Sequence, residues 1–337
     1  MNPWPSLAPF GKTLPMSGGE LFYYDSAGNA DSDPNGANGK TTIVLIHGLG
    51  DEADTWRHIF PLLVGAGYRI IAPDLPGFGR SIWRGRISMR GHRRAITQLI
   101  TIIGAASAEK PAVLAGSSLG AGIAEMIAYK RPYLVKALIL LDGCLPFEFK
   151  ADKTMFLMSL PFFGRTWYRA FRSNHEAAWR SLYPYYGNLD AMSEADKTFL
   201  RERVIARVES DNQERGYFST LRSMNSFILF RRRAAIRIGL YCLRGIKPET
   251  NTTPKQHTPL CFSTRSVAGV VDAPTKIAML WGEKDRVFLP RRADLLRRLR
   301  PDANFVFIAG AGHLPHQEKP DACAAEMLKF LQQELGL

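Results

Sequence analysis

Short apolar runs alternate with helical stretches through the first part of the chain, and this alternation most constrains the fold. The runs are TTIVLIH (Thr41–His47), YRIIAP (Tyr68–Pro73), PAVLAG (Pro111–Gly116) and KALILLD (Lys136–Asp142). Helical patterns separate them, around Thr55–Gly65, Met89–Ile103 and Leu119–Lys130. Continuous apolar runs are typical of parallel strands that are buried on both faces. The pattern predicts an α/β fold with a mostly parallel central sheet flanked by helices.

The alternation stops after Asp142 and resumes near the end of the chain. From Leu145 to about Val270 the sequence is helical in pattern and rich in arginine, without a convincing strand. Strand and helix patterns then return at Thr275–Gly282, Arg291–Leu299, Asn304–Gly310 and Ala322–Leu335. We therefore predict a core made of residues 1–144 and 271–337, interrupted by a helical lid of residues 145–270. The lid should cover the carboxyl ends of the strands, where open α/β sheets bind their ligands.

One other segment is set apart by its composition. The stretch Ser26–Lys40 is rich in Gly, Asn, Asp and Ser, which predicts a flexible hairpin loop between two strands.

A candidate nucleophile follows the third apolar run. Gly116-Ser117-Ser118-Leu119-Gly120 matches G-x-S-x-G, directly after a predicted strand and directly before a predicted helix. A serine on such a sharp turn needs small residues two positions away on either side, and it holds its Oγ clear of the sheet. By itself the pattern is short, and it also fits a turn that only closes a strand–helix unit. Its context favours Ser118 as a nucleophile.

A nucleophilic serine requires a base and a carboxylate that orients the base. Asp285 lies just beyond the run that ends at Gly282, and His313 follows the glycine-rich turn after the next run. The order Ser, Asp, His along the chain is the one expected for a nucleophile elbow of this type. Asp142, which also ends a strand, is the reserve acid. Glu283 and His316 are weaker candidates, because Glu283 lies nearer the strand end and His316 lacks a preceding glycine turn.

The segment His47-Gly48-Leu49-Gly50 follows the first apolar run. A loop in this place donates a backbone N–H to the tetrahedral intermediate of acyl transfer. We assign the N–H groups of Leu49 and Leu119 as the two oxyanion donors. For His47 we favour a role in orienting the loop over a role as base.

The charge of the chain is uneven. Net charge is +13, and residues 145–270 carry 20 Lys and Arg against 11 Asp and Glu, which is 20 − 11 = +9 of that excess. We find no nucleic-acid-binding motif, so we expect no nucleic-acid partner. The basic lid fits either a solvated Arg-rich face or a contact with an anionic surface. Its segment 227–247 resembles helices that rest on membrane surfaces, so a peripheral membrane contact stays open.

Cysteines and the amino terminus bear on compartment and cofactors. The four cysteines match no zinc or haem spacing, and no basic and apolar leader opens the chain. These features predict a protein of the reducing cytoplasm. The mechanism of the candidate triad needs neither a metal nor an organic cofactor. The oligomeric state is left open. Two interpretations fit the apolar residues of the lid: they line a substrate pocket, or they form the core of the lid itself, which we favour. These residues are Met155, Phe156, Met158, Phe162 and Phe163.

Five segments together resemble the α/β-hydrolase superfamily, in particular its lidded esterase and epoxide-hydrolase branch. They are VLIHGLGDEADTW, APDLPGFGRS, AGSSLGAG, LWGEKDRV and GAGHLPHQEKP, in the family's order. Epoxide hydrolases and haloalkane dehalogenases of this branch have an aspartate at the elbow, where this chain has Ser118. The resemblance therefore implies hydrolysis of a small-molecule carboxylic ester through an acyl-enzyme, and the apolar lid residues favour an apolar substrate. Carbon–carbon bond hydrolysis, cofactor-free haloperoxidation and a non-catalytic receptor or scaffold role remain alternatives.

Overall fold

A computed structural model describes residues 1–28, 41–143, 157–160, 162–225, 275–290, 297 and 300–337. Both expected lid boundaries, the basic segment 227–247, Met155, Phe156 and the helix expected at 291–299 (Arg297 apart) lie outside these residues.

In the described part of the chain, the core is one nine-stranded sheet. Its strands run in the order β1-β2-β4-β3-β6-β7-β8-β9, and β5 pairs with β2. Strands from β4 to β9 along this order are parallel, whereas β1, β2 and β5 form antiparallel pairs at one edge. The strands are β1 (Gly11–Met16), β2 (Gly19–Asp25), β3 (Thr42–Ile46), β4 (Arg69–Pro73), β5 (Ile82–Trp83), β6 (Ala112–Ser117), β7 (Val135–Leu141), β8 (Lys276–Gly282) and β9 (Asn304–Ile308). The predicted parallel sheet is confirmed.

The expected hairpin around Ser26–Lys40 is wrong. The strands that flank this segment, β2 and β3, do not pair with each other, because β4 lies between them and pairs with both. In the sheet, β2 and β3 are therefore separated by a strand that comes later in the chain.

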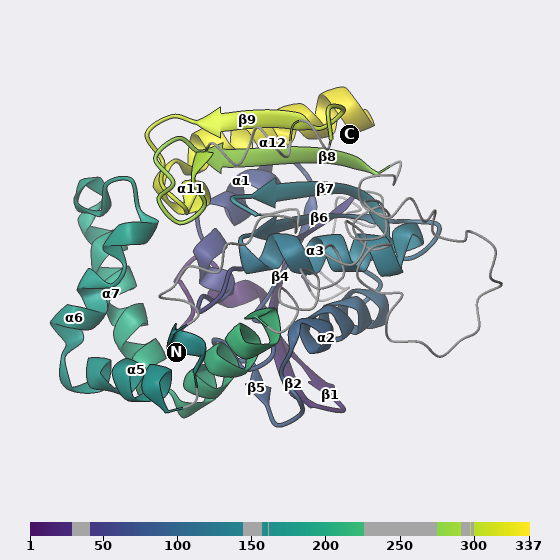
Figure 1. The fold of residues 1–337 in the computed structure, drawn as a ribbon. Helices are drawn as coiled ribbons and strands as arrows, with labels where there is room; N and C mark the ends of the chain where they lie inside the picture. The colour runs from purple at the N-terminus through teal and green to yellow at the C-terminus, as the bar shows by residue number, and fades with distance from the viewer. Residues whose placement is uncertain (29–40, 144–156, 161, 226–274, 291–296, 298–299) are drawn as a thin grey trace, which may run out of the picture.

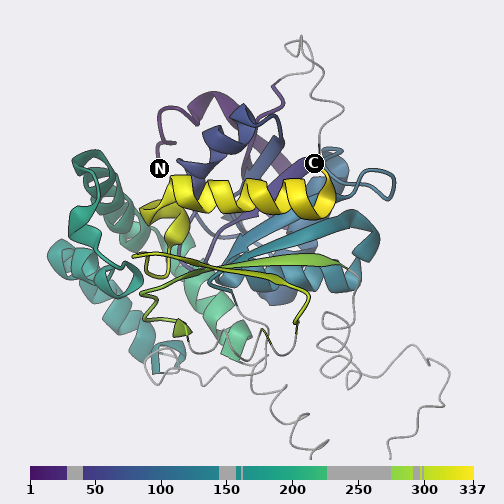
Figure 2. The same cartoon turned by 90° about the horizontal axis from the view of Figure 1, so that it is seen from above.

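Helices cover both faces of the sheet (Figures 1 and 2). α2 and α3 pack together on one face and α1 and α12 on the other, each pair over its own buried apolar cluster. All side chains of β3 and β6 are buried, as expected of central strands. The core helices are α1 (Ile59–Gly65), α2 (Met89–Ile102), α3 (Leu119–Lys130), α11 (Pro315–Glu318) and α12 (Pro320–Leu335).

The described part of the expected lid, which we call the cap (residues 157–225), is helical and contains no strand. It stands at the side to which the arrows of β8 and β9 point, so it lies over the carboxyl ends of the strands (Figure 1). A further helical segment covers residues 211–225. The named cap helices are α5 (Phe163–Ser173), α6 (His175–Arg180) and α7 (Glu194–Glu209).

The cap has its own small core. Tyr168, Val204 and Phe218 are buried together there, and Met158 packs against them as a lid-core residue should. For Phe162 and Phe163 this interpretation is wrong, because their side chains are 85% and 47% exposed. Phe162 directly precedes α5 and has a positive φ of 70°. Its side chain lies outside the cap core.

Candidate active site

Ser118 occupies a strained turn between β6 and α3. Its φ and ψ are 52° and −109°, a conformation that non-glycine residues rarely adopt and that clusters at functional sites. A Cβ on Gly120 would lie 2.1 Å from the carbonyl oxygen of Ile46, and one on Gly116 would lie 2.3 Å from the carbonyl carbon of Gly120. Only glycine fits at both positions, which confirms the predicted need for small residues there. Ser118 itself is only partly buried.

Asp285 and His313 meet at the carboxyl ends of β8 and β9. The Nδ1 atom of His313 lies 2.9 Å from Oδ2 of Asp285, and both side chains are buried. The other carboxylate oxygen, Oδ1, accepts the N–H groups of Val287 at 2.7 Å and Phe288 at 2.9 Å. Because the carboxylate is an acceptor, His313 donates from Nδ1, which leaves Nε2 with a free lone pair that can accept a proton.

The loop that carries His313 is held from the cap as well as from the core. The N–H of His313 donates to the carbonyl of Tyr185 in the cap at 2.8 Å. Glu318 accepts the N–H of Gly312 on one oxygen and the N–H of Gly187 on the other, at 2.7 and 2.8 Å. His313 is thus held through both its backbone N–H and its imidazole ring.

Asp142, the reserve acid, lies beside this pair. It follows β7 with a φ of 43°, and its Oδ1 accepts the N–H of Gly282 at 2.8 Å. Its Oδ2 is buried and accepts no hydrogen bond from the described residues. Burial, and next the negative charge of Asp285, raise the pKa of Asp142 well above its ordinary value. Asp142 is therefore the neutral member of the carboxyl pair.

Atoms of Asp142, Asp285 and His313 that could ligate a cation lie within 4.8 Å of one another. The carboxylate of Asp285 already accepts three hydrogen bonds, and Asp142 favours its protonated form. A neutral Asp142 beside an Asp285 that already accepts these hydrogen bonds is poorly suited to bind a cation.

His47 orients the loop after β3. Its Nε2 accepts the N–H of Leu75 at 2.9 Å, so its Nδ1 carries the hydrogen and donates to the carbonyl of Gly48 at 2.7 Å. The side chain is fully buried, and burial lowers its pKa. A neutral, doubly hydrogen-bonded His47 fits the expected orienting role.

The two expected oxyanion donors flank the elbow. Leu119 is the first residue of α3, where an N–H has no partner within its own helix. The loop of Leu49 packs against the elbow, since a Cβ on Gly48 would lie 3.6 Å from Cβ of Ser118. Both N–H groups therefore belong to backbone next to Ser118.

The weaker candidates have structural partners. Glu283 accepts the N–H of Gly310 at 3.0 Å. His316 is buried against Thr55, whose Oγ1 lies 2.8 Å from its Nε2, and burial lowers the pKa of His316 to about 3.

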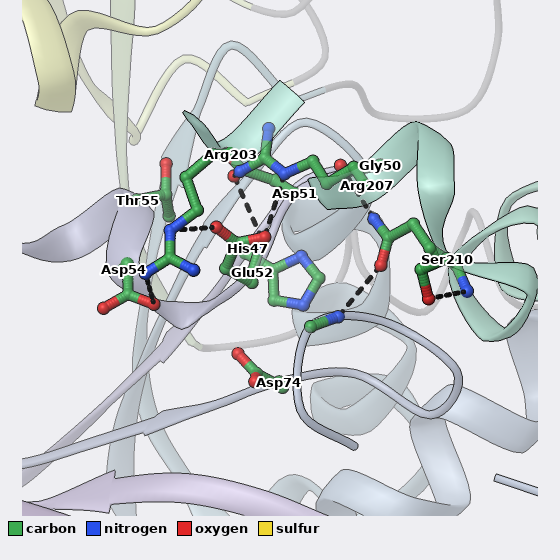
Figure 3. A network of polar contacts seen from close by, with 12 residues as sticks. His47, Gly50, Asp51, Glu52, Asp54, Thr55, Asp74, Arg203, Arg207 and Ser210 are labelled. Atoms are coloured by element: carbon green, nitrogen blue, oxygen red, sulfur yellow. Dashed lines mark hydrogen bonds and ion pairs between the residues drawn. The ribbon is translucent and has the colours of Figure 1, made fainter. Parts of the chain in front are cut away.

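A network of charged side chains between the core and α7 was not predicted. Arg203 and Arg207 of α7 point toward the acidic residues of the loop after β3, Asp51, Glu52 and Asp54 (Figure 3). The sequence shows these arginines only as part of a basic helical surface, and no local pattern indicates their partners.

The sequence profile of the α/β hydrolase fold family matches residues 41–320. The chain belongs to the α/β-hydrolase family. A lipase of Psychrobacter immobilis is 22% identical over 319 residues, which are 95% of this chain and 83% of the lipase. An uncharacterised protein of Mycobacterium tuberculosis is 35% identical over 102 residues, which are 30% of this chain and only 28% of that relative's length.

Solved structures share the fold across nearly the whole chain. A thermophilic esterase from Thermogutta terrifontis superposes with a TM-score of 0.65 at 18% identity, covering 96% of this chain and 98% of the esterase. A meta-cleavage product hydrolase gives a TM-score of 0.63 at 16% identity, covering 96% and 99%. The family supports an enzyme of the hydrolase class. Among the described residues, no helix is both long and apolar enough to cross a bilayer.

Proposed function

We propose that this hydrolase cleaves an apolar small-molecule carboxylic ester with Ser118, His313 and Asp285 as its catalytic triad. The observation that carries the proposal is the buried 2.9 Å contact between His313 and Asp285 at the same sheet edge as the strained Ser118. That contact leaves Nε2 of His313 as the base, and the elbow holds a serine Oγ clear of the sheet.

Each step of the reaction follows from these roles. Ser118 Oγ attacks the ester carbonyl while His313 takes its proton, and the collapse of the tetrahedral intermediate releases the alcohol, which receives that proton. A water molecule, deprotonated by His313, then attacks the acyl-enzyme and releases the acid. Asp285 keeps the imidazole in the required tautomer and stabilises its charged form.

The oxyanion forms next to two backbone donors in this proposal. The N–H groups of Leu49 and Leu119 stabilise it, and one such donor contributes roughly 3–4 kcal/mol to the transition state. The hydrogen bond from His47 to the carbonyl of Gly48 supports this role. The carbonyl of Gly48 and the N–H of Leu49 belong to the same peptide group, so holding one fixes the direction of the other.

The test is hydrolysis of p-nitrophenyl esters from acetate to decanoate by the wild type, Ser118→Ala and Ser117→Ala. Ser117 is a matched control, because it is adjacent, buried, and absent from the proposed chemistry. We expect turnover to vanish in Ser118→Ala and to persist in Ser117→Ala, with a chain-length optimum that sizes the pocket. A folded wild type without turnover on any ester would contradict the proposal and favour carbon–carbon hydrolysis or a receptor role.

A further inference from the structure

The loop that follows the proposed donor Leu49 is held by an amide side chain of the cap. Gln213 donates from Nε2 to the carbonyl of Gly50 at 3.0 Å, and its Oε1 accepts the N–H of Gly79 at 2.9 Å. The side chain is 1% exposed, so both contacts are made away from water. One cap residue thereby bridges two core loops, and one of them is the proposed oxyanion loop.

Two arginines of α7 hold the next residues of the same loop. Arg207 contacts the carboxylates of Asp51 and Glu52, with its Nε 2.9 Å from Oε2 of Glu52. The second oxygen of Glu52 lies 3.4 Å from Nε of Arg203. These charges hold the pKa of Glu52 down to about 2 despite its burial. Figure 3 shows the arginines reaching this loop from the cap.

The loop thus has one anchor before Leu49 and several after it. His47 holds the carbonyl of Gly48 from the core side. On the other side, Gly50 has a φ of 80°, a conformation that glycine adopts without strain, and its carbonyl is held by Gln213. The Gly50 carbonyl shares its peptide group with the N–H of Asp51, which donates to the carbonyl of Gly48 at 3.4 Å. Gln213 therefore acts, through this peptide, on the same Gly48 carbonyl that His47 holds and that shares its peptide group with the Leu49 N–H.

We propose that Gln213 is a positioning residue that lets the cap set the direction of the Leu49 N–H toward the oxyanion. The inference rests on the proposed function, and it makes the cap part of the transition-state machinery as well as a cover for the site. Because Gln213 acts through Gly50 and does not touch substrate, its loss should lower kcat and leave substrate binding nearly unchanged.

The chain offers a matched control in the preceding residue. Asn212 also donates a side-chain amide N–H to a core carbonyl, that of Ser81, at 2.9 Å. That contact ties the same cap segment to the core but does not reach the oxyanion loop. Asn212→Leu removes one amide-to-backbone contact between cap and core, and Gln213→Leu removes two, of which one reaches the oxyanion loop. Only Gln213→Leu should affect catalysis.

The experiment measures kcat and KM on a p-nitrophenyl ester, affinity for phenylboronic acid, and thermal melting of the full chain. Phenylboronic acid forms a tetrahedral adduct with a nucleophilic serine and so reports on the oxyanion site. For Gln213→Leu we expect kcat and boronate affinity to fall about tenfold, less than the hundred- to thousand-fold that follows loss of a donor itself. KM should stay within about twofold, as should every parameter of Asn212→Leu.

Equal kcat and boronate affinity in wild type and Gln213→Leu would overturn the inference, as would an equal loss in Asn212→Leu. If Gln213→Leu fails to fold, Gln213→Met, which has a similar length and no amide, is measured in its place. Ser118-dependent activity of the wild type is established first. A null result for Gln213 therefore concerns the positioning role and leaves the proposed esterase activity intact.

Discussion

Replacing Asp285 by Asn should separate the roles of the two neighbouring carboxyls. Oδ1 of Asp285 accepts the N–H groups of Val287 and Phe288, and Oδ2 accepts Nδ1 of His313. In Asp285→Asn the remaining oxygen stays with the two backbone donors, and the NH₂ group turns toward His313. Two donors cannot face each other, so the imidazole must carry its hydrogen on Nε2, where it cannot accept the proton of Ser118.

The size of the effect follows from this loss of the base. A wrong tautomer at an otherwise intact triad lowers kcat by roughly 10⁴, which corresponds to about 5 kcal/mol of transition-state stabilisation. Steady-state hydrolysis of a p-nitrophenyl ester measures it. The double variant Ser118→Ala/Asp285→Asn should lose little more than Ser118→Ala alone, because the residues act as a unit.

Asp142→Asn is the matched comparison. Burial and the charge of Asp285 favour the protonated form of Asp142, and its Oδ1 accepts the N–H of Gly282. Asparagine has the same acceptor and a donor in the same place, so kcat should stay within about threefold of wild type. A large loss in Asp142→Asn together with an active Asp285→Asn would refute this reasoning and make Asp142 the catalytic acid.

Two further predictions concern stability. His316 has a pKa of about 3 in the folded chain, below the ordinary value, so its contribution to stability is complete above about pH 6.5 and declines as the pH falls from there toward 3. Urea unfolding at pH values between 7 and 5 measures how steeply the free energy of unfolding changes with pH. In His316→Gln this slope should be smaller than in the wild type by up to about 1.4 kcal/mol per pH unit. An unchanged slope would contradict the burial of a neutral imidazole. Gly120→Ala should abolish folding, because its Cβ would lie 2.1 Å from the carbonyl oxygen of Ile46, whereas Gly122→Ala, whose nearest neighbour is 3.9 Å away, should melt at or above the wild-type temperature. Circular dichroism checks both, and a normally folded Gly120→Ala would contradict the required close approach.

The parts of the fold that could be predicted are those that local sequence determines. Buried parallel strands are continuous apolar runs, so β6 and β7 lie within one residue of their predicted bounds. The pairing of Asp285 with His313 followed from their places after adjacent strands, because the ends of parallel strands meet at one edge. The antiparallel edge was beyond such reasoning. Strand β2 pairs with β4, which comes some fifty residues later in the chain. The sequence of Ser26–Lys40 contains no pattern that indicates this pairing.

The cap–core contacts were also beyond the sequence, for a different reason. Gln213 lies on an ordinary polar helix, and neither its burial nor its two backbone partners leave a local pattern. Arg203 and Arg207 sit on a helix whose charges fit a solvated face equally well. For Arg203 that interpretation is wrong, since it is 5% exposed. The acidic partners of both arginines lie about 150 positions away along the chain, so no local pattern could indicate them.

These contacts change what the positive charge of the chain implies. The lid segment 145–270 carries a formal excess of +9 in the sequence, which invites a search for an anionic partner. Arg203 and Arg207 already meet the acidic residues Asp51, Glu52 and Asp54 within the molecule. Acidic side chains from the core thus neutralise part of the cap's charge away from solvent. The formal charge therefore overstates the positive charge that the described part of the cap presents to a partner. The same ion pairs fasten the cap to the core at the loop on which the proposed chemistry depends.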